Sequence, residues 1–256
     1  MKGSIFDLSG RAALITGGSR GLGKAMARIF AEAGADVLIA SRHEDQLQSA
    51  ASEIARATAV RVEYCVADMT RRDDVRRLAD TAVERLGKVD ILVGNAGFNV
   101  PQPIDQIEDD DWDRLLELNL TSCMALTRAL VPGMKTRRWG RVIHVSSVLG
   151  LASAAGRSAY SATKSALLGL ARAAALDLGP FGVTVNCIAP GPFATEMPMS
   201  ILTDRQKEDF AGRTALGRWG RPEELAGPAL LLASEAGSFI TGAVLVVDGG
   251  TMVKLF

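Results

Sequence analysis

The segment ITGGSRGLG, residues 15–23, places four glycines between an apolar run and a helix-like stretch, and it fits three different motifs. Gly17 to Gly21 match the G-x-S-x-G elbow of a serine hydrolase. Gly18 to Lys24 come within one residue of a nucleotide-binding P-loop. The segment also matches the glycine turn of a dinucleotide-binding fold. All three motifs lie between a strand and a helix, so the rest of the chain has to decide among them.

The apolar run before this turn is the first of seven similar runs along the chain. Each is short and rich in β-branched residues: RAALIT, ADVLIA, VRVEYCV, KVDILV, RVIHVSS, GVTVNCIA and AVLVVD. Between them apolar residues return every three or four positions, which predicts helices over segments that include 23–33, 44–57, 73–86 and 111–138. This alternation predicts an α/β fold, a Rossmann-type doubly wound parallel sheet of about seven strands flanked by helices. Ligands are then expected outside the carboxyl ends of the strands.

Length and composition favour a single domain and a small ligand. The 256 residues are 48% hydrophobic, which suffices for a large core in one domain spanning residues 1–256. Lys plus Arg (29) balance Asp plus Glu (29), so no strong field favours nucleic acid or an anionic membrane, and we expect neither as a partner. The start MKGSIFDLSG lacks the apolar run of a signal peptide, and no stretch reaches the ~18 apolar residues of a membrane span. We therefore expect a cytoplasmic protein.

The cysteines and one long loop complete the organisation of the chain. Cys65, Cys123 and Cys187 lie far apart and form no C-x-x-C pattern, so we expect buried thiols, no disulfide and no metal site. Residues 190–219 are expected to form one long irregular region that contains several prolines and glycines. A mobile lid over the substrate site is one interpretation of this region, and a surface excursion without a functional role is the other.

Two of the three motifs lack residues that their chemistry needs. A P-loop requires a hydroxyl directly after its lysine to hold magnesium, but Ala25 follows Lys24. A hydrolase elbow requires a histidine base, and the histidines are His43 and His144. His144 lies inside the apolar run RVIHVSS, which favours a core position, and Ser19 follows the first strand instead of a later one. The dinucleotide interpretation remains, with glycines that let the backbone approach a pyrophosphate at the N-terminus of the next helix.

Further motifs extend this interpretation along the chain. T-G-x-x-x-G-x-G at residues 16–23 is followed by Asn-Ala-Gly at 95–97, Ser147, Tyr-x-x-x-Lys at 160–164 and Pro-Gly at 190–191. Together these motifs resemble the short-chain dehydrogenase/reductase family, and the resemblance covers essentially the whole chain, including the closing ITGAVLVVDGG. It implies an NAD(P)(H)-dependent oxidoreductase that interconverts a secondary alcohol and a ketone by hydride transfer. It also implies a homotetramer formed through residues 111–138, residues 158–178 and the last strand.

Tyr160 and Lys164 have the chemistry that this reaction needs. They are four positions apart on an expected helix and therefore share one face. A free tyrosine is a poor acid or base near neutral pH, but an ammonium group about 5 Å away favours the phenolate by roughly 3 kcal/mol at an effective dielectric of about 20. Ser147, at the end of RVIHVSS, is placed to donate a hydrogen bond to the substrate oxygen. By resemblance, Asn119 completes a catalytic tetrad by holding a water in a proton relay.

The end of the second strand indicates which nicotinamide cofactor is preferred. NAD-selective sites place a carboxylate there for the adenosine ribose, but LIASRH offers Ser41 and Arg42 instead. A guanidinium binds a 2′-phosphate bidentately, and Arg20 in the glycine turn is a second charge in reach. We expect NADP(H) to be preferred and NAD(H) to be possible; the alternative is that Arg42 is a solvated loop arginine. By resemblance the cofactor contacts Gly17, Ser19, Arg20, Gly21, Leu22, Gly23, Ser41, Arg42, Asp68, Met69, Asn95, Ala96, Gly97, Tyr160, Lys164, Pro190, Gly191, Phe193 and Thr195.

The sequence restricts the substrate less than the cofactor. FDLSGRAALITGGSRGLG and LGPFGVTVNCIAPGPFATEM are similar to gluconate 5-dehydrogenase-like and 3-oxoacyl-carrier-protein reductase-like members of the family. We favour a sugar acid, polyol or other small hydroxy or keto compound. Carrier-protein reductases use surface arginines to dock an acidic partner; Arg137 and Arg138 match one such position, but the second falls on Phe181. A non-catalytic NAD(P)-binding sensor is a third hypothesis, because this fold also supports binding without chemistry.

Overall fold

The computed structural model describes residues 3–254, apart from the side chains of Met197 and Ile201. Within these residues seven strands pair in parallel in the order β3-β2-β1-β4-β5-β6-β7. The predicted Rossmann-type doubly wound sheet is confirmed. Its strands are β1 (Ala12–Thr16), β2 (Asp36–Ser41), β3 (Val62–Val66), β4 (Ile91–Gly94), β5 (Gly140–Val145), β6 (Val183–Pro190) and β7 (Val244–Val247).

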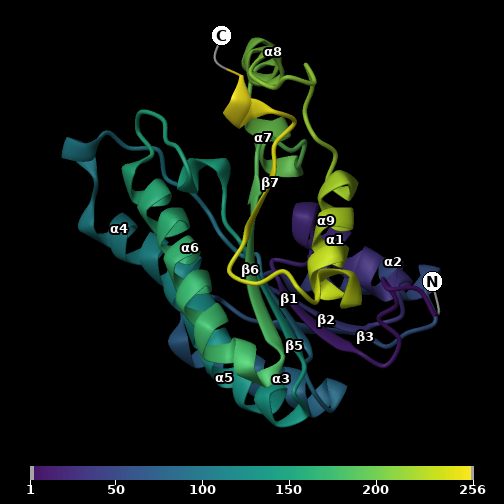
Figure 1. Ribbon diagram of the computed structural model, residues 1–256. Helices are drawn as coiled ribbons and strands as arrows, with labels where there is room; N and C mark the ends of the chain where they lie inside the picture. Colours follow the sequence, from purple (N-terminus) through teal and green to yellow (C-terminus); the bar gives the residue numbers. More distant parts are fainter. Residues whose placement is uncertain (1–2, 255–256) are drawn as a thin grey trace.

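Helices cover both faces of the sheet (Figure 1). Neighbouring residues of a strand point to opposite faces, so Leu14 packs in one core while Ile15 packs in the other. Both side chains are fully buried, because parallel strands between two helical layers meet no solvent on either side. The core of Leu14 is closed by α3 (Arg72–Leu86), α5 (Ser122–Arg137) and α6 (Ser158–Leu178), and that of Ile15 by α1 (Gly21–Glu32), α2 (Glu44–Ala57) and α9 (Glu223–Ala233).

The single helix expected over residues 111–138 is wrong in detail. The structure has α4 (Asp109–Leu116), a π-helical segment (Glu117–Thr121) and then α5. A π turn holds one extra residue, which shifts the apolar pattern by only one position and leaves little trace in the periodicity. Asn119 lies in the middle of this segment, so the predicted catalytic asparagine occupies the irregular turn of the helix.

The region 190–219 is more regular than the sequence analysis expected. Pro190 is the last residue of β6, and the following chain contains α7 (Glu196–Ile201) and α8 (Asp204–Gly212). In Figure 1 both helices lie beyond the end of β6. The hydroxyl of Thr203 accepts a hydrogen bond from the Gln206 amide, and the Gln206 side chain accepts one from the Thr203 amide. This capping box is readable as T-x-x-Q, so the sequence did carry a signal for the start of α8.

The remaining regular elements are single turns that connect the strands and helices. They are 3₁₀ turns at Ile104–Gln106, Val148–Gly150, Gly179–Phe181, Glu235–Gly237 and Thr251–Val253. Among the described residues, no helix is both long enough and apolar enough to cross a membrane. Cys65, Cys123 and Cys187 are buried free thiols, as expected.

His144 is the second-last residue of β5 and is fully buried, in agreement with its expected core position. Neither ring nitrogen has a hydrogen-bond partner among the described residues. Burial disfavours the charged imidazolium and lowers its pKa from 6.5 to about 4, and the positive charge of Lys164 acts in the same direction. The imidazole is therefore neutral in the folded protein at physiological pH.

We predict that this histidine makes the protein less stable as the pH falls from 6.5 to 4. In that window the unfolded chain binds a proton at residue 144 that the folded chain does not bind, so the free energy of unfolding decreases by about 3 kcal/mol in total. His144→Leu is expected to remove this component. Urea unfolding followed by circular dichroism at several pH values measures it.

His43→Gln is the control for this prediction, because His43 is the other histidine of the chain and is exposed, whereas His144 is buried. The control is expected to keep the pH dependence of the parent protein. Equal slopes for the parent and His144→Leu between pH 6.5 and 4 would contradict the prediction.

Candidate active site

A cleft of about 200 Å³ opens at the carboxyl ends of β1, β2 and β4. It brings together ten of the residues expected to contact the cofactor: Gly17, Ser19, Arg20, Ser41, Arg42, Asp68, Met69, Asn95, Ala96 and Gly97. The sequence analysis missed five further lining residues: His43, Gln46, Ala67, Phe98 and Leu118. Nine expected contact residues do not line this cleft: Gly21, Leu22, Gly23, Tyr160, Lys164, Pro190, Gly191, Phe193 and Thr195.

The glycine turn before α1 needs glycine for steric reasons. Gly17 and Gly21 have φ of +66° and +55°, a region that L-residues with a Cβ rarely adopt. A Cβ on Gly23 would overlap the carbonyl oxygen of Gly17. The turn can therefore fold tightly onto the first turn of α1, whose leading N–H groups have no acceptor within the helix. These N–H groups and the positive end of the helix dipole fit the pyrophosphate of a dinucleotide.

Thr16 fixes this turn to the loop after β4. Its Oγ1 accepts hydrogen bonds from the backbone amides of Asn95 and Ala96, both at 3.0 Å. The side-chain amide of Asn95 donates to the carbonyl oxygens of Thr16 at 2.8 Å and Gly17 at 3.2 Å. The sequence analysis quoted Thr16 within its motif but gave it no role. Its role depends on a partner 79 positions away, which no local pattern reveals.

The part of the cleft next to the end of β2 contains Arg42, the positive charge expected near the adenosine ribose. Ser41 and Arg42 follow β2, and Arg42 is exposed. Among the described residues that line the cleft, Asp68 is the only carboxylate, and it accepts two hydrogen bonds from Thr70, at 2.9 Å and 2.8 Å. The residues at and after the end of β2 that line the cleft are Ser41, Arg42, His43 and Gln46, and none of them is the carboxylate that an NAD-selective site would have there.

Tyr160 and Lys164 share one face of α6, as their spacing predicts. The Nζ of Lys164 lies 5.7 Å from the centroid of the Tyr160 ring. Lys164 is only 4% exposed, and its Nζ donates a 2.8 Å hydrogen bond to the carbonyl oxygen of Val145 at the end of β5. A buried ammonium group is expensive unless it is hydrogen-bonded, and this bond holds the charge beneath the tyrosine ring.

Asn119 is completely buried and links the loop after β4 to α6 by hydrogen bonds. Its Oδ1 accepts a 3.1 Å hydrogen bond from the Phe98 amide, and its Nδ2 donates to the Phe98 carbonyl at 3.0 Å and to Thr163 Oγ1 at 3.1 Å. A Cβ on Gly97 would lie 3.1 Å from Asn119 Oδ1 and 3.3 Å from Lys164 Nζ. The π segment, the loop after β4 and α6 therefore converge at this point.

Ser147 follows the end of β5 and begins the next turn. Its Oγ accepts a 3.1 Å hydrogen bond from the Leu149 amide, which caps this 3₁₀ turn. Ser147 is buried and Tyr160 is half-buried, and the two described side chains form no hydrogen bond with each other. Both hydroxyl groups can therefore still donate to a third oxygen.

The expected contact residues after β6 have different neighbours, and Thr195 lies close to the glycine turn. Gly191 approaches the backbone of Asp248 so closely that a Cβ would lie 2.7 Å from its Cα. Phe193 is buried and bridges to Gly220. A Cβ on Gly21 would lie 3.2 Å from the Cγ2 of Thr195, so Thr195 faces the first turn of α1.

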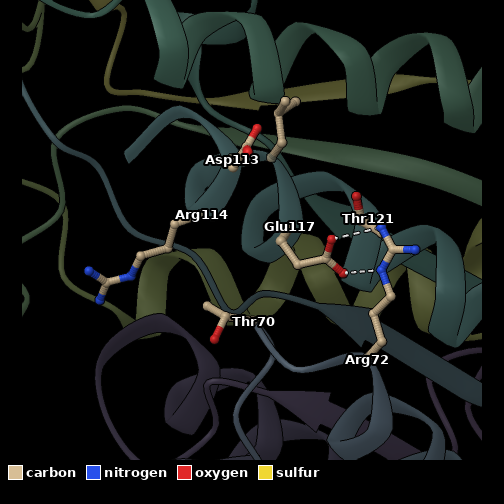
Figure 2. Close-up of a pocket in the computed structure, with 7 residues that line it drawn as sticks. Thr70, Arg72, Asp113, Arg114, Glu117 and Thr121 are labelled. Atoms are coloured by element: carbon tan, nitrogen blue, oxygen red, sulfur yellow. Dashed lines mark hydrogen bonds and ion pairs between the residues drawn. The ribbon is translucent and has the colours of Figure 1, made fainter. Parts of the chain in front are cut away.

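A larger cavity of about 540 Å³ lies outside this site (Figure 2). Its lining contains a bidentate ion pair in which both nitrogen–oxygen distances between Arg72 and Glu117 are 3.0 Å. It shares no lining residue with the smaller cleft, and none of the four predicted catalytic residues lines it. None of these four residues lines the smaller cleft either, but ten of the expected cofactor contacts line it and none of them lines the larger cavity.

Comparisons with known proteins agree with this architecture. The family model described as enoyl-(acyl carrier protein) reductase matches residues 17–252. Gluconate 5-dehydrogenase of Gluconobacter oxydans is 38% identical over 98% of both chains, and a 3-oxoacyl-acyl-carrier-protein reductase of Chlamydia muridarum is 36% identical over 95% of this chain and 98% of the relative. The fold is also similar to a solved structure of a candidate NAD(P)-dependent gluconate 5-dehydrogenase from Beutenbergia cavernae, which contains bound NADP at low occupancy. The TM-score is 0.92, and the two sequences are 34% identical over 98% of this chain and 100% of that chain.

The sheet order, the glycine turn and the cleft at the strand ends are those of a dinucleotide-binding fold. The chain belongs to the short-chain dehydrogenase/reductase family. The enzyme class predicted from the sequence, an NAD(P)-dependent oxidoreductase, is confirmed.

Proposed function

We propose that this enzyme uses Tyr160 as the general acid and base for interconversion of a secondary alcohol and a ketone. The observation that carries the proposal is the buried ammonium of Lys164 beneath the Tyr160 ring, on one face of α6. The cofactor, when bound, supplies or accepts the hydride. In reduction the Tyr160 hydroxyl gives its proton to the carbonyl oxygen of the substrate, and in oxidation its phenolate removes the proton of the alcohol.

The other three residues of the tetrad support this proton transfer in different ways. Lys164 holds its buried ammonium group beneath the Tyr160 ring, and we assign to the same group the binding of ribose hydroxyls. Ser147 donates a hydrogen bond to the substrate oxygen while charge develops there. Asn119 holds the loop of Phe98 against α6 through its three hydrogen bonds, and we assign it the relay water.

We favour a sugar acid, polyol or other small hydroxy or keto compound as the substrate. The gluconate 5-dehydrogenase of 38% identity supports this choice. The carrier-protein alternative is supported by the 36% identical reductase, but the two arginines expected to dock the carrier are bound elsewhere. Arg137 binds Asp90 at 3.0 Å, and Arg138 donates to the Pro180 carbonyl at 2.9 Å. Asp90 directly precedes β4, so Arg137 lies at the amino-terminal end of this strand, whereas the cleft lies at the carboxyl ends of the strands.

We predict that Tyr160→Phe lowers turnover at least 100-fold without weakening cofactor binding, because it removes only the proton-transferring oxygen. Turnover is followed by nicotinamide absorbance with NADPH and NADH against ketones, keto-sugar acids and acetoacetyl thioesters. Tyr64→Phe is the matched control, since Tyr64 is the other tyrosine of the chain and lies in β3. Unchanged turnover in Tyr160→Phe would refute the assigned role. Cofactor binding without turnover on any compound would favour the sensor hypothesis.

We propose that NADP(H) is preferred over NAD(H). The exposed Arg42 after β2 and the lack of a carboxylate among the described residues there support this preference. Arg42→Ala is predicted to weaken NADPH binding about 10- to 100-fold, the range of a lost charge-assisted contact, and to leave NADH binding nearly unchanged. Calorimetric titration measures both constants. Arg56→Ala is the control, because Arg56 lies in the last turn of α2 (Glu44–Ala57), the helix that follows Arg42. Equal losses of affinity for both cofactors in Arg42→Ala would contradict the prediction.

We propose a homotetramer. Apolar side chains exposed on α6, after α9, on the outermost strand β7 and at its C-terminal end support an interface there: Leu176, Phe239, Val246 and Val253. Size-exclusion chromatography with light scattering is predicted to give four times the mass of one chain. A particle with the mass of a single chain would contradict the proposal.

We also propose that the enzyme acts in the cytoplasm on a small-molecule substrate. Three buried, unpaired thiols suit a reducing compartment. Cell fractionation with an antibody against the protein checks the location.

A further inference from the structure

The start of α7 contacts the glycine turn through an ion pair as well as through Thr195. Glu196 Oε2 lies 3.5 Å from Arg20 Nη1. Glu196 is the first residue of α7, and Arg20 directly precedes α1. This ion pair joins the predicted lid, residues 190–219, to the glycine turn, and its Arg20 also lines the cleft.

Arg20 has a second anionic group to bind when the cofactor carries a 2′-phosphate. It lines the same cleft as Ser41, Arg42 and His43, which follow the end of β2 where the adenosine ribose is expected. A phosphate and a carboxylate both bind the planar guanidinium through its fixed N–H groups. The two anions would therefore compete for Arg20.

We propose that Glu196 sets the selectivity between NADP and NAD by competing with the 2′-phosphate for Arg20. The inference rests on the proposed function, because it assumes that this cleft binds the cofactor. In the free enzyme Glu196 holds Arg20. Binding of NADP transfers Arg20 to the 2′-phosphate, whereas NAD leaves the ion pair in place. Glu196 thus weakens binding of NADP selectively.

The exposure of the ion pair makes this exchange easy. The side chains of Arg20 and Glu196 are 47% and 71% exposed, so both are solvated and the pair is weak. A phosphate dianion carries more charge than a carboxylate, so the 2′-phosphate displaces Glu196 from Arg20. Loss of the Arg20–Glu196 ion pair then lowers the affinity of the enzyme for NADP. Salt screens such exposed charges, so the effect of Glu196 shrinks as ionic strength rises.

The test is calorimetric titration of the full chain with 2′,5′-ADP and 5′-ADP, which differ only in the 2′-phosphate and contain no nicotinamide. Glu196→Gln is expected to tighten binding of 2′,5′-ADP about two- to fivefold at low salt, the range for one exposed ion pair. Its affinity for 5′-ADP is expected to stay unchanged. Glu208→Gln, an exposed residue of the neighbouring helix α8, makes the same change of charge and is expected to alter neither affinity.

The Arg20→Ala background separates competition from simple repulsion between Glu196 and the phosphate. If Glu196 acts through Arg20, the added Glu196→Gln change has no effect once Arg20 is absent. Tighter binding of 2′,5′-ADP in that background would overturn the proposal in favour of direct repulsion.

Two further outcomes distinguish this inference from the proposed function. An unchanged ratio of the two affinities in Glu196→Gln, with normal binding by the parent protein, would overturn the inference alone. A parent protein that binds neither nucleotide would overturn the cofactor assignment and the inference together.

Discussion

The hydroxyl group of Thr16 holds together the two halves of the site. It accepts hydrogen bonds from two backbone amides of the loop after β4, and the side-chain amide of Asn95 in that loop donates a hydrogen bond to the carbonyl oxygen of Thr16. Two residues after Asn95, a Cβ on Gly97 would lie only 3.1 Å from Asn119 Oδ1 and 3.3 Å from Lys164 Nζ. These hydrogen bonds join the glycine turn to the loop after β4, and those of Asn119 join that loop to α6. The proton and hydride transfers that we propose depend on such a connection, because their rates depend on short distances between reacting atoms.

The buried charge of Lys164 is the second constraint on the site. An ammonium group that is almost completely removed from water keeps a strong local field, because little solvent screens it. The same charge contributes to the lowered pKa of His144 on the neighbouring strand, after burial itself. Its hydrogen bond to Val145 offsets part of the cost of burial and directs it toward the face that carries Tyr160. The fold thus places one buried positive charge on the face of α6 that carries Tyr160.

Sequence patterns predicted the regular parts of the molecule well and the irregular parts poorly. The seven strands and the doubly wound sheet followed from short apolar runs, because parallel strands that are buried on both faces consist almost entirely of apolar, β-branched residues. The π segment around Asn119 escaped detection because its conformation is held by hydrogen bonds to Phe98 and Thr163 from distant parts of the chain. The helix α8 escaped because the prolines and glycines before it outweighed its capping box at Thr203.

The sequence alone determined the fold, the family and the residue types available for catalysis, because each depends on local spacing: glycines that permit a turn, a tyrosine and a lysine on one helix face, and an arginine after a strand. Only the tertiary structure decided which groups meet. It joined Thr16 to a loop 79 residues away and placed Asn119 in a π turn. It also bound Arg137 to Asp90 at the amino-terminal end of β4 and brought Glu196 to Arg20. These contacts join segments that are remote in the chain, and their distances depend on how both cores pack, which no local pattern encodes.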